Sequence, residues 1–148
     1  MSNFCEINGD VTVQVQGNSS SISIVSFQTG IPEGKISWVV KSYVRKENTA
    51  AMDLVKNWSV SSVEFLHCDL IQGVPAILFS LGGFSGNHFH DFSDLVIPLY
   101  ITSRQFNGEV QFLVTDNRPW WITKFQGILR KLSRYDIIDI DREDKIHC

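Results

Sequence analysis

The second half of the chain alternates apolar runs with amphipathic stretches. The run from Val74 to Ser80 is continuously apolar and is bounded by glycines, which is typical of a strand buried on both faces. The pattern then predicts a helix, a strand, a helix and a strand, in that order, over residues 87–106, 109–115, 120–132 and 135–140. Residues 71–148 are therefore expected to form a β-α-β-α-β unit of the α/β class, built on a parallel sheet.

The first 70 residues have a different pattern, and we expect a β-rich leading segment over 1–70. Short strands are indicated where apolar and polar residues alternate, over residues 8–30, 36–44 and 60–66. Before the last of these, apolar residues at helical spacing predict a helix over 48–58, with Asn48 or Thr49 as its N-cap. The whole chain is expected to be one domain.

The predicted helix over 87–106 has two unlike faces. At about 100° per residue, four polar side chains fall within about 60° of one direction: Asn87, His90, Asp91 and Asp94. The apolar side chains fall on the opposite arc: Phe89, Phe92, Leu95, Val96, Leu99, Tyr100 and Phe106. The polar face begins just after a strand, at the carboxyl end where ligands of α/β sheets bind. Pro98 should kink this helix, because it removes the backbone bond to the Asp94 carbonyl.

The residue types of the polar face are those of acid-base chemistry. A histidine beside one or two carboxylates can act as a general base, since the carboxylate fixes the tautomer and stabilises the imidazolium. A carboxylate by itself could also deprotonate a sugar hydroxyl. The ordinary alternative is a solvated helix face, on which aspartates near the N-terminus simply favour the helix dipole.

The glycine-rich stretch between the strand at 74–80 and this helix approaches two known motifs. The stretch 82–86 approaches a phosphate-binding loop, but position 81 is a leucine where the motif needs glycine. Residues 83–87 also approach a nucleophile elbow, and Ser85, Asp116 and His147 follow the chain order of an α/β-hydrolase triad. Asn87 then occupies a position that favours a small residue, so an ordinary glycine turn with an incidental serine is the alternative interpretation.

Other polar groups suggest binding rather than catalysis. Arg118, Trp120, Trp121 and Lys124 follow a predicted strand end, and such residues suit stacking on a sugar or contact with a phosphate. The alternative is that one or both tryptophans pack in the core. We expect no structural zinc, since His88 and His90 would lie about 200° apart on a helix.

Composition narrows the class of protein. The chain has 148 residues, of which 43% are hydrophobic and 20% charged, with a net charge of −3. Those values exclude a disordered chain, and nothing indicates a nucleic-acid partner. No signal peptide or membrane span is evident, which by itself favours a cytosolic domain. Asn18 and Asn57 nevertheless lie in glycosylation acceptor motifs, and of three cysteines Cys148 is expected to lack a partner.

Several longer motifs together resemble one known family. They are Val-Pro-Ala-Ile-Leu-Phe-Ser-Leu-Gly-Gly (74–83), Gly-Asn-His-Phe-His-Asp-Phe-Ser-Asp (86–94), Ser-Arg-Gln-Phe-Asn-Gly-Glu-Val-Gln-Phe (103–112), Pro-Trp-Trp (119–121) and Ile-Asp-Ile-Asp (138–141). This set resembles the plant branch of glycosyltransferase family 61, which includes xylan arabinosyl- and xylosyltransferases. The resemblance covers nearly the whole chain and places it in the N-terminal part of the catalytic region.

The resemblance implies an inverting enzyme of the Golgi that transfers arabinose or xylose from a UDP-sugar to a polysaccharide such as xylan. It implies a GT-B fold of two Rossmann-like domains, of which this chain would contain the first. The family's Asn-x-x-His motif falls on Asn87 and His90, with Asp91 and Asp94 beside it, and any of the last three could be the base.

The family's donor-binding segment and membrane anchor do not occur in this sequence, and no cofactor is implied. We therefore expect the main UDP-sugar site to lie outside this chain, with membrane attachment only through an absent anchor. A truncated, non-catalytic paralogue or binding module is the main alternative, and a serine hydrolase using Ser85 is a third.

Overall fold

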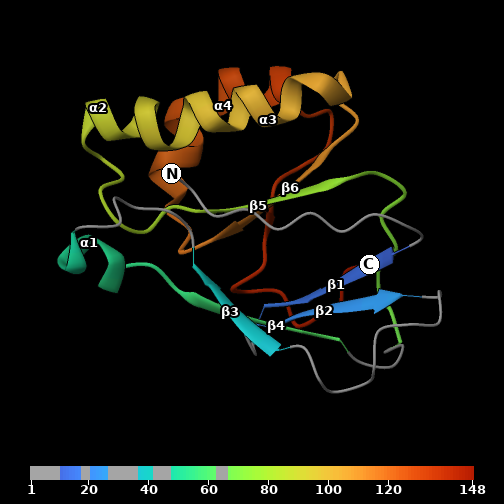
Figure 1. Ribbon diagram of the computed structural model, residues 1–148. Coiled ribbons are helices and arrows are strands. Elements are labelled where there is room, and N and C mark those ends of the chain that lie inside the picture. Colours follow the sequence, from blue (N-terminus) through green and yellow to red (C-terminus); the bar gives the residue numbers. More distant parts are fainter. Residues whose placement is uncertain (1–10, 18–20, 27–36, 42–47, 63–66) are drawn as a thin grey trace.

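The computed structural model describes residues 11–17, 21–26, 37–41, 48–62 and 67–148, and Figure 1 shows their arrangement. The strands are β1 (Val11–Gln16), β2 (Ser21–Ser26), β3 (Ser37–Lys41), β4 (Asn57–Ser62), β5 (Ala76–Ser80), β6 (Gln111–Thr115) and β7 (Ile138–Asp139). The helices are α1 (Thr49–Asp53), α2 (His88–His90), the π-helix η1 (Asp91–Val96), α3 (Ile97–Ser103), the 3-10 helix η2 (Arg104–Phe106) and α4 (Pro119–Leu132).

The leading segment forms a four-stranded mixed sheet in the order β1-β2-β4-β3. β2 and β4 run parallel, whereas β1 with β2 and β3 with β4 are antiparallel. The predicted helix over 48–58 is too long, because α1 ends at Asp53 and Trp58 lies in β4, where its ring is buried. Asn48 is the N-cap, and its side chain accepts a hydrogen bond from the Ala51 N–H at 3.0 Å.

The last residues of the chain lie beside this sheet. His147 exchanges backbone hydrogen bonds with Val15 of β1, and on its other side Cys148 N–H donates to the Leu70 carbonyl. Cys68 and Cys148 form a disulfide that spans 80 residues of sequence. The expectation that Cys148 lacks a partner is therefore wrong, because strand-like pairing brings it beside a cysteine from a distant part of the sequence.

Residues 76–139 build a separate parallel sheet in the order β5-β6-β7. The helical stretch 88–106 connects β5 to β6, and α4 connects β6 to β7. β6 is buried along its whole length, whereas in β5 only the carboxyl-terminal Phe79 and Ser80 are buried. Burial on both faces, expected for the whole run from Val74, is thus found in the central strand instead.

Two apolar cores enclose the parallel sheet from opposite sides. One core joins it to α3 and α4 and includes Leu81, Phe112, Trp121 and Phe125. The other joins it to the mixed sheet through a cluster of Val15, Trp58, Leu113 and Ile140. Figure 1 shows the resulting three layers, with the helices above, the parallel sheet in the middle and the mixed sheet below.

The helical stretch 88–106 is not one regular helix. Its π-helical part ends with the Ile97 N–H donating to the Phe92 carbonyl, five residues back, directly before Pro98. Proline cannot donate to the Asp94 carbonyl, and a π segment absorbs this irregularity. The wider turn changes the angle between successive side chains, so the polar face deduced for a regular helix does not hold throughout.

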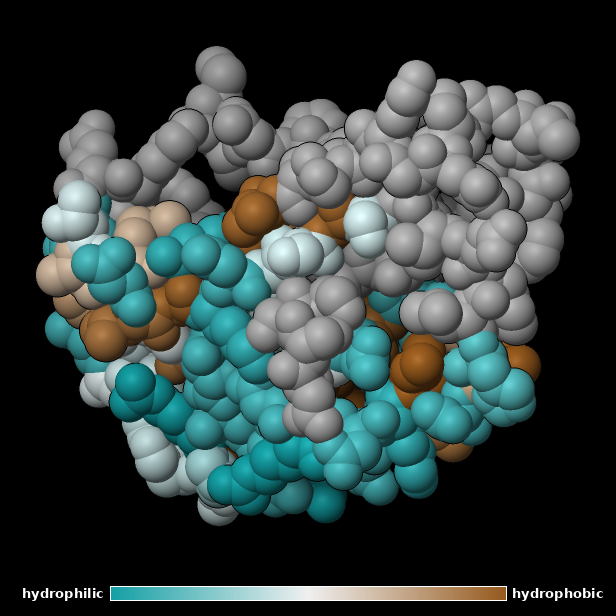
Figure 2. Space-filling model, turned by 90° about the horizontal axis from the view of Figure 1, so that it is seen from below, coloured by the Kyte–Doolittle hydropathy of each residue, from teal (hydrophilic) through white to brown (hydrophobic). Residues whose placement is uncertain are grey.

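The described part of one face of the molecule is largely polar. Figure 2, seen from below, shows a mostly hydrophilic face on which apolar residues form small separate patches. Among the described residues, no helix is both long and apolar enough to span a bilayer.

Candidate functional site

A polar cluster lies at the carboxyl end of the parallel sheet, where all three strands end. Ser80 Oγ donates to Oδ2 of Asp116 at 2.5 Å, and the Asp116 N–H donates to Oδ2 of Asp141 at 2.5 Å. Lys56 Nζ lies 2.8 Å from Oδ1 of Asp141. Burial alone would raise the pKa of Asp141, but bonds from Lys56, Asp116 and Thr115 outweigh it and keep the pKa below its ordinary value.

This cluster ties the mixed sheet to the parallel sheet. Lys56 precedes β4, and it reaches Asp141 across 85 residues of sequence. Sequence reasoning overlooked Lys56, Ser80 and Asp141 as site residues. The end positions of the three parallel strands could have indicated Ser80 and Asp141, but no local pattern indicates Lys56.

The glycine-rich turn after β5 uses two of its backbone donors internally. The Gly82 N–H donates to Ser80 Oγ at 3.0 Å, and the Gly86 N–H donates to Oδ1 of Asp91 at 2.8 Å. A Cβ on Gly82 would lie 2.4 Å from the Leu54 carbonyl oxygen, so this glycine permits a close approach of α1. The turn is thus built for packing, and two of the donors that a phosphate loop would offer are already engaged.

His90 and Asp94 form a hydrogen-bonded pair on the next element. His90 Nδ1 lies 2.7 Å from Oδ2 of Asp94, and Ser93 Oγ donates to the other carboxylate oxygen at 2.6 Å. A carboxylate accepts only, so Nδ1 is the donor, and in the neutral form of the ring the lone pair is on Nε2. This is the arrangement of an oriented general base.

Aromatic rings hold this imidazole on two sides. Phe84 is stacked on His90 with ring centroids 4.7 Å apart, and Phe89 meets it edge-on at 5.4 Å. Phe84 in turn packs against the cluster of Ala51, in α1, and Val55, just after it. In Figure 1, α1 and α2 lie at the same end of the molecule, beyond the carboxyl end of β5. Phe89, expected to face the core, is 62% exposed.

Asp91 does not share the face of His90 and Asp94, contrary to the prediction. Its side chain is fully buried, and it accepts from Gly86 N–H, from Trp121 Nε1 at 2.8 Å and from Lys124 Nζ at 2.9 Å. Burial would raise its pKa, but these three bonds outweigh that effect and lower it. Asp91 is thus buried and fully bonded in the packing between two helical elements.

The remaining predicted residues take separate places. Asn87 is the N-cap of α2, and its side chain accepts from the Phe89 N–H at 3.1 Å. Trp121 is fully buried, as the packing alternative expected, whereas Trp120 is 48% exposed. Arg118 is the residue before α4, and its carbonyl accepts from the Trp121 N–H.

The three residues of the hydrolase hypothesis do not form a triad. Ser85 Oγ donates to the Leu81 carbonyl, and Asp116 binds Ser80. The buried ring of His147 has no hydrogen-bond partner on either nitrogen among the described residues, so it cannot be bonded to Ser85 or Asp116. The hydrolase interpretation is wrong, because His147 belongs to the mixed sheet and not to the carboxyl end of β5.

No metal site emerges from the described part of the chain, where no group of three or more potential ligands converges. The ring of His88, one of the residues weighed as a ligand, meets that of Phe92 edge-on at 5.1 Å.

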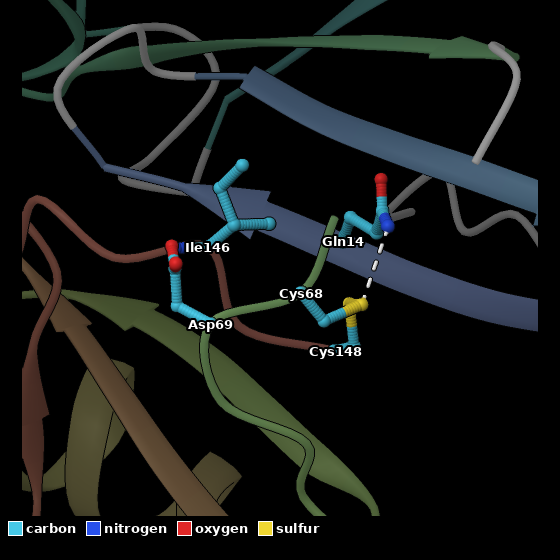
Figure 3. Close-up of a disulfide and its surroundings, with 5 residues drawn as sticks. All are labelled: Gln14, Cys68, Asp69, Ile146 and Cys148. Carbon is cyan, nitrogen blue, oxygen red and sulfur yellow. Dashed lines mark hydrogen bonds between the residues drawn. A yellow bond between two sulfur atoms is a disulfide. The ribbon is translucent and has the colours of Figure 1, made fainter. Parts of the chain in front are cut away.

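The cysteines and the glycosylation motifs bear on the cellular compartment of the protein. In Figure 3, Cys68 and Cys148 are joined, and Gln14 donates to the sulfur of Cys68 at 3.4 Å. Asn57 is exposed at the start of β4, whereas Asn18 lies outside the described residues.

Comparison with known proteins finds relatives that match nearly the whole chain. It is 39% identical over 150 residues to the alpha-1,3-arabinosyltransferase XAT3 of Oryza sativa subsp. japonica, covering 99% of this chain and 25% of that protein. It is 34% identical over 163 residues to the beta-1,2-xylosyltransferase XYXT1 of the same species, covering 99% and 35%. The xylan glycosyltransferase MUCI21 of Arabidopsis thaliana is 33% identical over 153 residues, covering 99% and 31%.

The chain thus spans about a quarter to a third of the length of these relatives. No family model and no solved structure matches it. The resemblance to the plant branch of glycosyltransferase family 61 is confirmed by these names and identities. The chain is therefore a homologue of these plant arabinosyl- and xylosyltransferases and corresponds to one segment of them.

Proposed function

We propose that this chain is the N-terminal part of the catalytic region of an inverting glycosyltransferase. The complete protein transfers arabinose or xylose from a UDP-sugar to a cell-wall polysaccharide such as xylan. The names of the relatives support the pentose and the xylan acceptor. Because the chain spans only part of those proteins, the reaction belongs to the complete protein.

The observation that carries the proposal is the His90–Asp94 pair. Inversion needs a base that takes the proton of the acceptor hydroxyl while its oxygen attacks the anomeric carbon and UDP leaves. His90 Nε2 is the proton acceptor, and Asp94, 2.7 Å from Nδ1, fixes the ring and stabilises the imidazolium. Asn87 caps the turn that presents His90.

The fold supports this role. The β-α-β connections and a candidate base just beyond a strand's carboxyl end are shared with Rossmann-like units, although here the mixed sheet, not helices, covers the second face of the parallel sheet. We assign this unit to the acceptor-side half of a GT-B enzyme, with the main UDP-sugar site outside this chain. Arg118 and Trp120, at the start of α4, are assigned to substrate binding.

The complete protein is proposed to work in the lumen of the Golgi. The Cys68–Cys148 disulfide and the exposed Asn57 acceptor motif support an oxidising, secretory compartment. These two features outweigh the cytosolic expectation that the absence of a recognisable signal had favoured.

The test is made on the complete protein with UDP-arabinose, UDP-xylose and xylooligosaccharides. His90→Ala should lower kcat by at least about 100-fold, and Asp94→Asn should lower it less, with unchanged melting temperatures. His88→Ala is the matched control, because this neighbouring histidine is exposed and does not pair with Asp94. Full activity in His90→Ala would refute the assignment of the base.

The same experiment tests the alternative of a non-catalytic binding module. That alternative draws on the fraction of the relatives that the chain spans. It predicts that the complete protein binds xylooligosaccharides but releases no UDP with any pentose donor.

A further inference from the structure

We infer that Trp120, seated on Gly86, is a stacking platform for the sugar chain that accepts the pentose. This inference rests on the proposed function. It adds that Trp120 binds the acceptor sugar by stacking and that Gly86 makes room for its ring. The ligand is a pentose-containing oligosaccharide that offers the apolar C–H face of a ring.

The first step is the exposure of Trp120. It follows Pro119 at the start of α4 and is 48% exposed, whereas its neighbour Trp121 is fully buried. Burial of Trp121 anchors the first turn of α4, so the adjacent Trp120 is held on a rigid support. A large, rigid aromatic surface that loses little conformational entropy is what recognition of a flat apolar face requires.

The second step is the fit between Trp120 and Gly86. A Cβ on Gly86 would lie 3.2 Å from Cη2 and 3.6 Å from Cζ2 of the Trp120 ring. Gly86 also has a φ of +106°, a conformation that residues with side chains rarely adopt. The indole therefore rests against a turn in which only glycine combines this backbone conformation with this contact.

The third step is the carboxylate of Asp91, which holds both Gly86 and the residue next to Trp120. Oδ1 of Asp91 accepts from the Gly86 N–H and from Trp121 Nε1, each at 2.8 Å. One carboxylate oxygen thus joins the glycine of the turn to the residue next to Trp120. The geometry of the platform is set before any ligand arrives, which reduces the entropic cost of binding.

The fourth step is the position of the platform relative to the proposed base. Gly86 directly precedes Asn87, the N-cap of α2, and His90 closes that short helix. A sugar stacked on Trp120 would therefore lie against the same turn that leads into the His90–Asp94 pair. A platform at this place suits the acceptor chain, since the acceptor is the substrate that the base must reach.

The test is a titration of the 148-residue chain with xylohexaose, followed by the indole N–H signals of its tryptophans in NMR spectra. We expect a saturable shift of the Trp120 signal, and Trp120→Ala should weaken binding by about tenfold or more. Tyr100→Ala is the matched control, because Tyr100 is also an aromatic side chain, half-exposed on α3. It should bind as the native chain does.

Gly86→Ala tests the contact itself, since it should weaken binding while Trp120 is still present. Where this variant proves unfolded, the comparison of Trp120→Ala with Tyr100→Ala decides. Absence of binding, or equal binding by these two variants, overturns the inference. A drop in the melting temperature of the complete protein in Trp120→Ala, with unchanged xylohexaose binding, would also overturn it and assign Trp120 to an interface.

Failure here is distinguishable from failure of the proposed function. If His90→Ala abolishes transfer but Trp120→Ala binds normally, the base is right and the platform is wrong. If Trp120→Ala loses binding but His90→Ala retains full transfer, the platform is right and the base is wrong.

Discussion

Nζ of Lys124 lies 2.9 Å from Oδ2 of Asp91, and this pair joins the helical stretch that carries His90 to α4. Asp91 is fully buried, whereas the side chain of Asp94, three residues later, retains about a quarter of its exposure. The two aspartates therefore have different roles: Asp91 contributes to packing, and Asp94 pairs with the proposed base.

Replacing each aspartate by alanine should change the free energy of unfolding by different amounts. Asp91→Ala leaves the Gly86 N–H and Trp121 Nε1 without their acceptor, so the free energy of unfolding should fall by about 2–4 kcal/mol. Asp94→Ala should cost less than about 1 kcal/mol, because the Asp94–His90 pair is partly exposed. Urea denaturation measures both values, and equal losses would contradict the distinction.

The disulfide should contribute strongly to stability. Cys68 and Cys148 close a loop of 80 residues, and loop-closure entropy predicts a loss of about 4–5 kcal/mol in the Cys68→Ser/Cys148→Ser variant. The same variant serves as the control for reduction: dithiothreitol should destabilise the native chain but leave the variant unchanged. An effect of dithiothreitol on the variant as large as on the native chain would exclude this disulfide as the cause.

Local patterns predicted those parts of the fold that depend on neighbouring residues. The alternation of Val11 to Val15 indicated β1, and Asn48 was one of two expected helix caps. The apolar runs located all three strands of the parallel sheet, and the observed strands are shorter than the predicted ones. These features rest on periodicity and capping, which act over a few residues.

The candidate site was only partly predictable, for two physical reasons. Helical periodicity placed Asp91 and His90 on one broad polar face, but neighbouring helical residues point about 100° apart, and α4 packs on the side that Asp91 takes. The second reason is distance along the chain, because Lys56 finds Asp141 only when the two sheets pack together. Trp58 is a further case in which long-range packing decides the local structure. Its spacing favoured a helix, but pairing with Val40 makes it part of β4.

Asn57 should carry an N-linked glycan when the chain passes through the secretory pathway. Asn57 and Ser59 are both exposed, while Trp58 between them is buried, so the acceptor asparagine and the hydroxyl share the solvent-facing side of β4. Asn57→Gln and Ser59→Ala should each remove one glycan that peptide N-glycosidase releases. Ser61→Ala, outside the motif, should not, and an unchanged glycan mass in Asn57→Gln would contradict the assignment.

His147 should make stability depend on pH in the mildly acidic range. Its ring is buried, and burial is the main cause that lowers its pKa below the ordinary value of 6.5, with Lys145 adding to it and Glu143 and Asp69 opposing it. As the pH falls below about 6.5, the unfolded chain therefore takes up a proton at this residue that the folded chain does not. Stability should decrease toward the folded pKa, by at most about 1.4 kcal/mol per pH unit from this residue.

Urea denaturation at several pH values between 7.5 and 5 checks this slope. His147→Gln should flatten it, because the titrating ring is gone. His88→Ala should retain it, since His88 is an exposed histidine on another element, α2. A slope that is the same in the native chain and in His147→Gln would assign the pH dependence to other groups. Loss of the slope in His147→Gln alone would identify the buried ring beside the Cys68–Cys148 disulfide as its source.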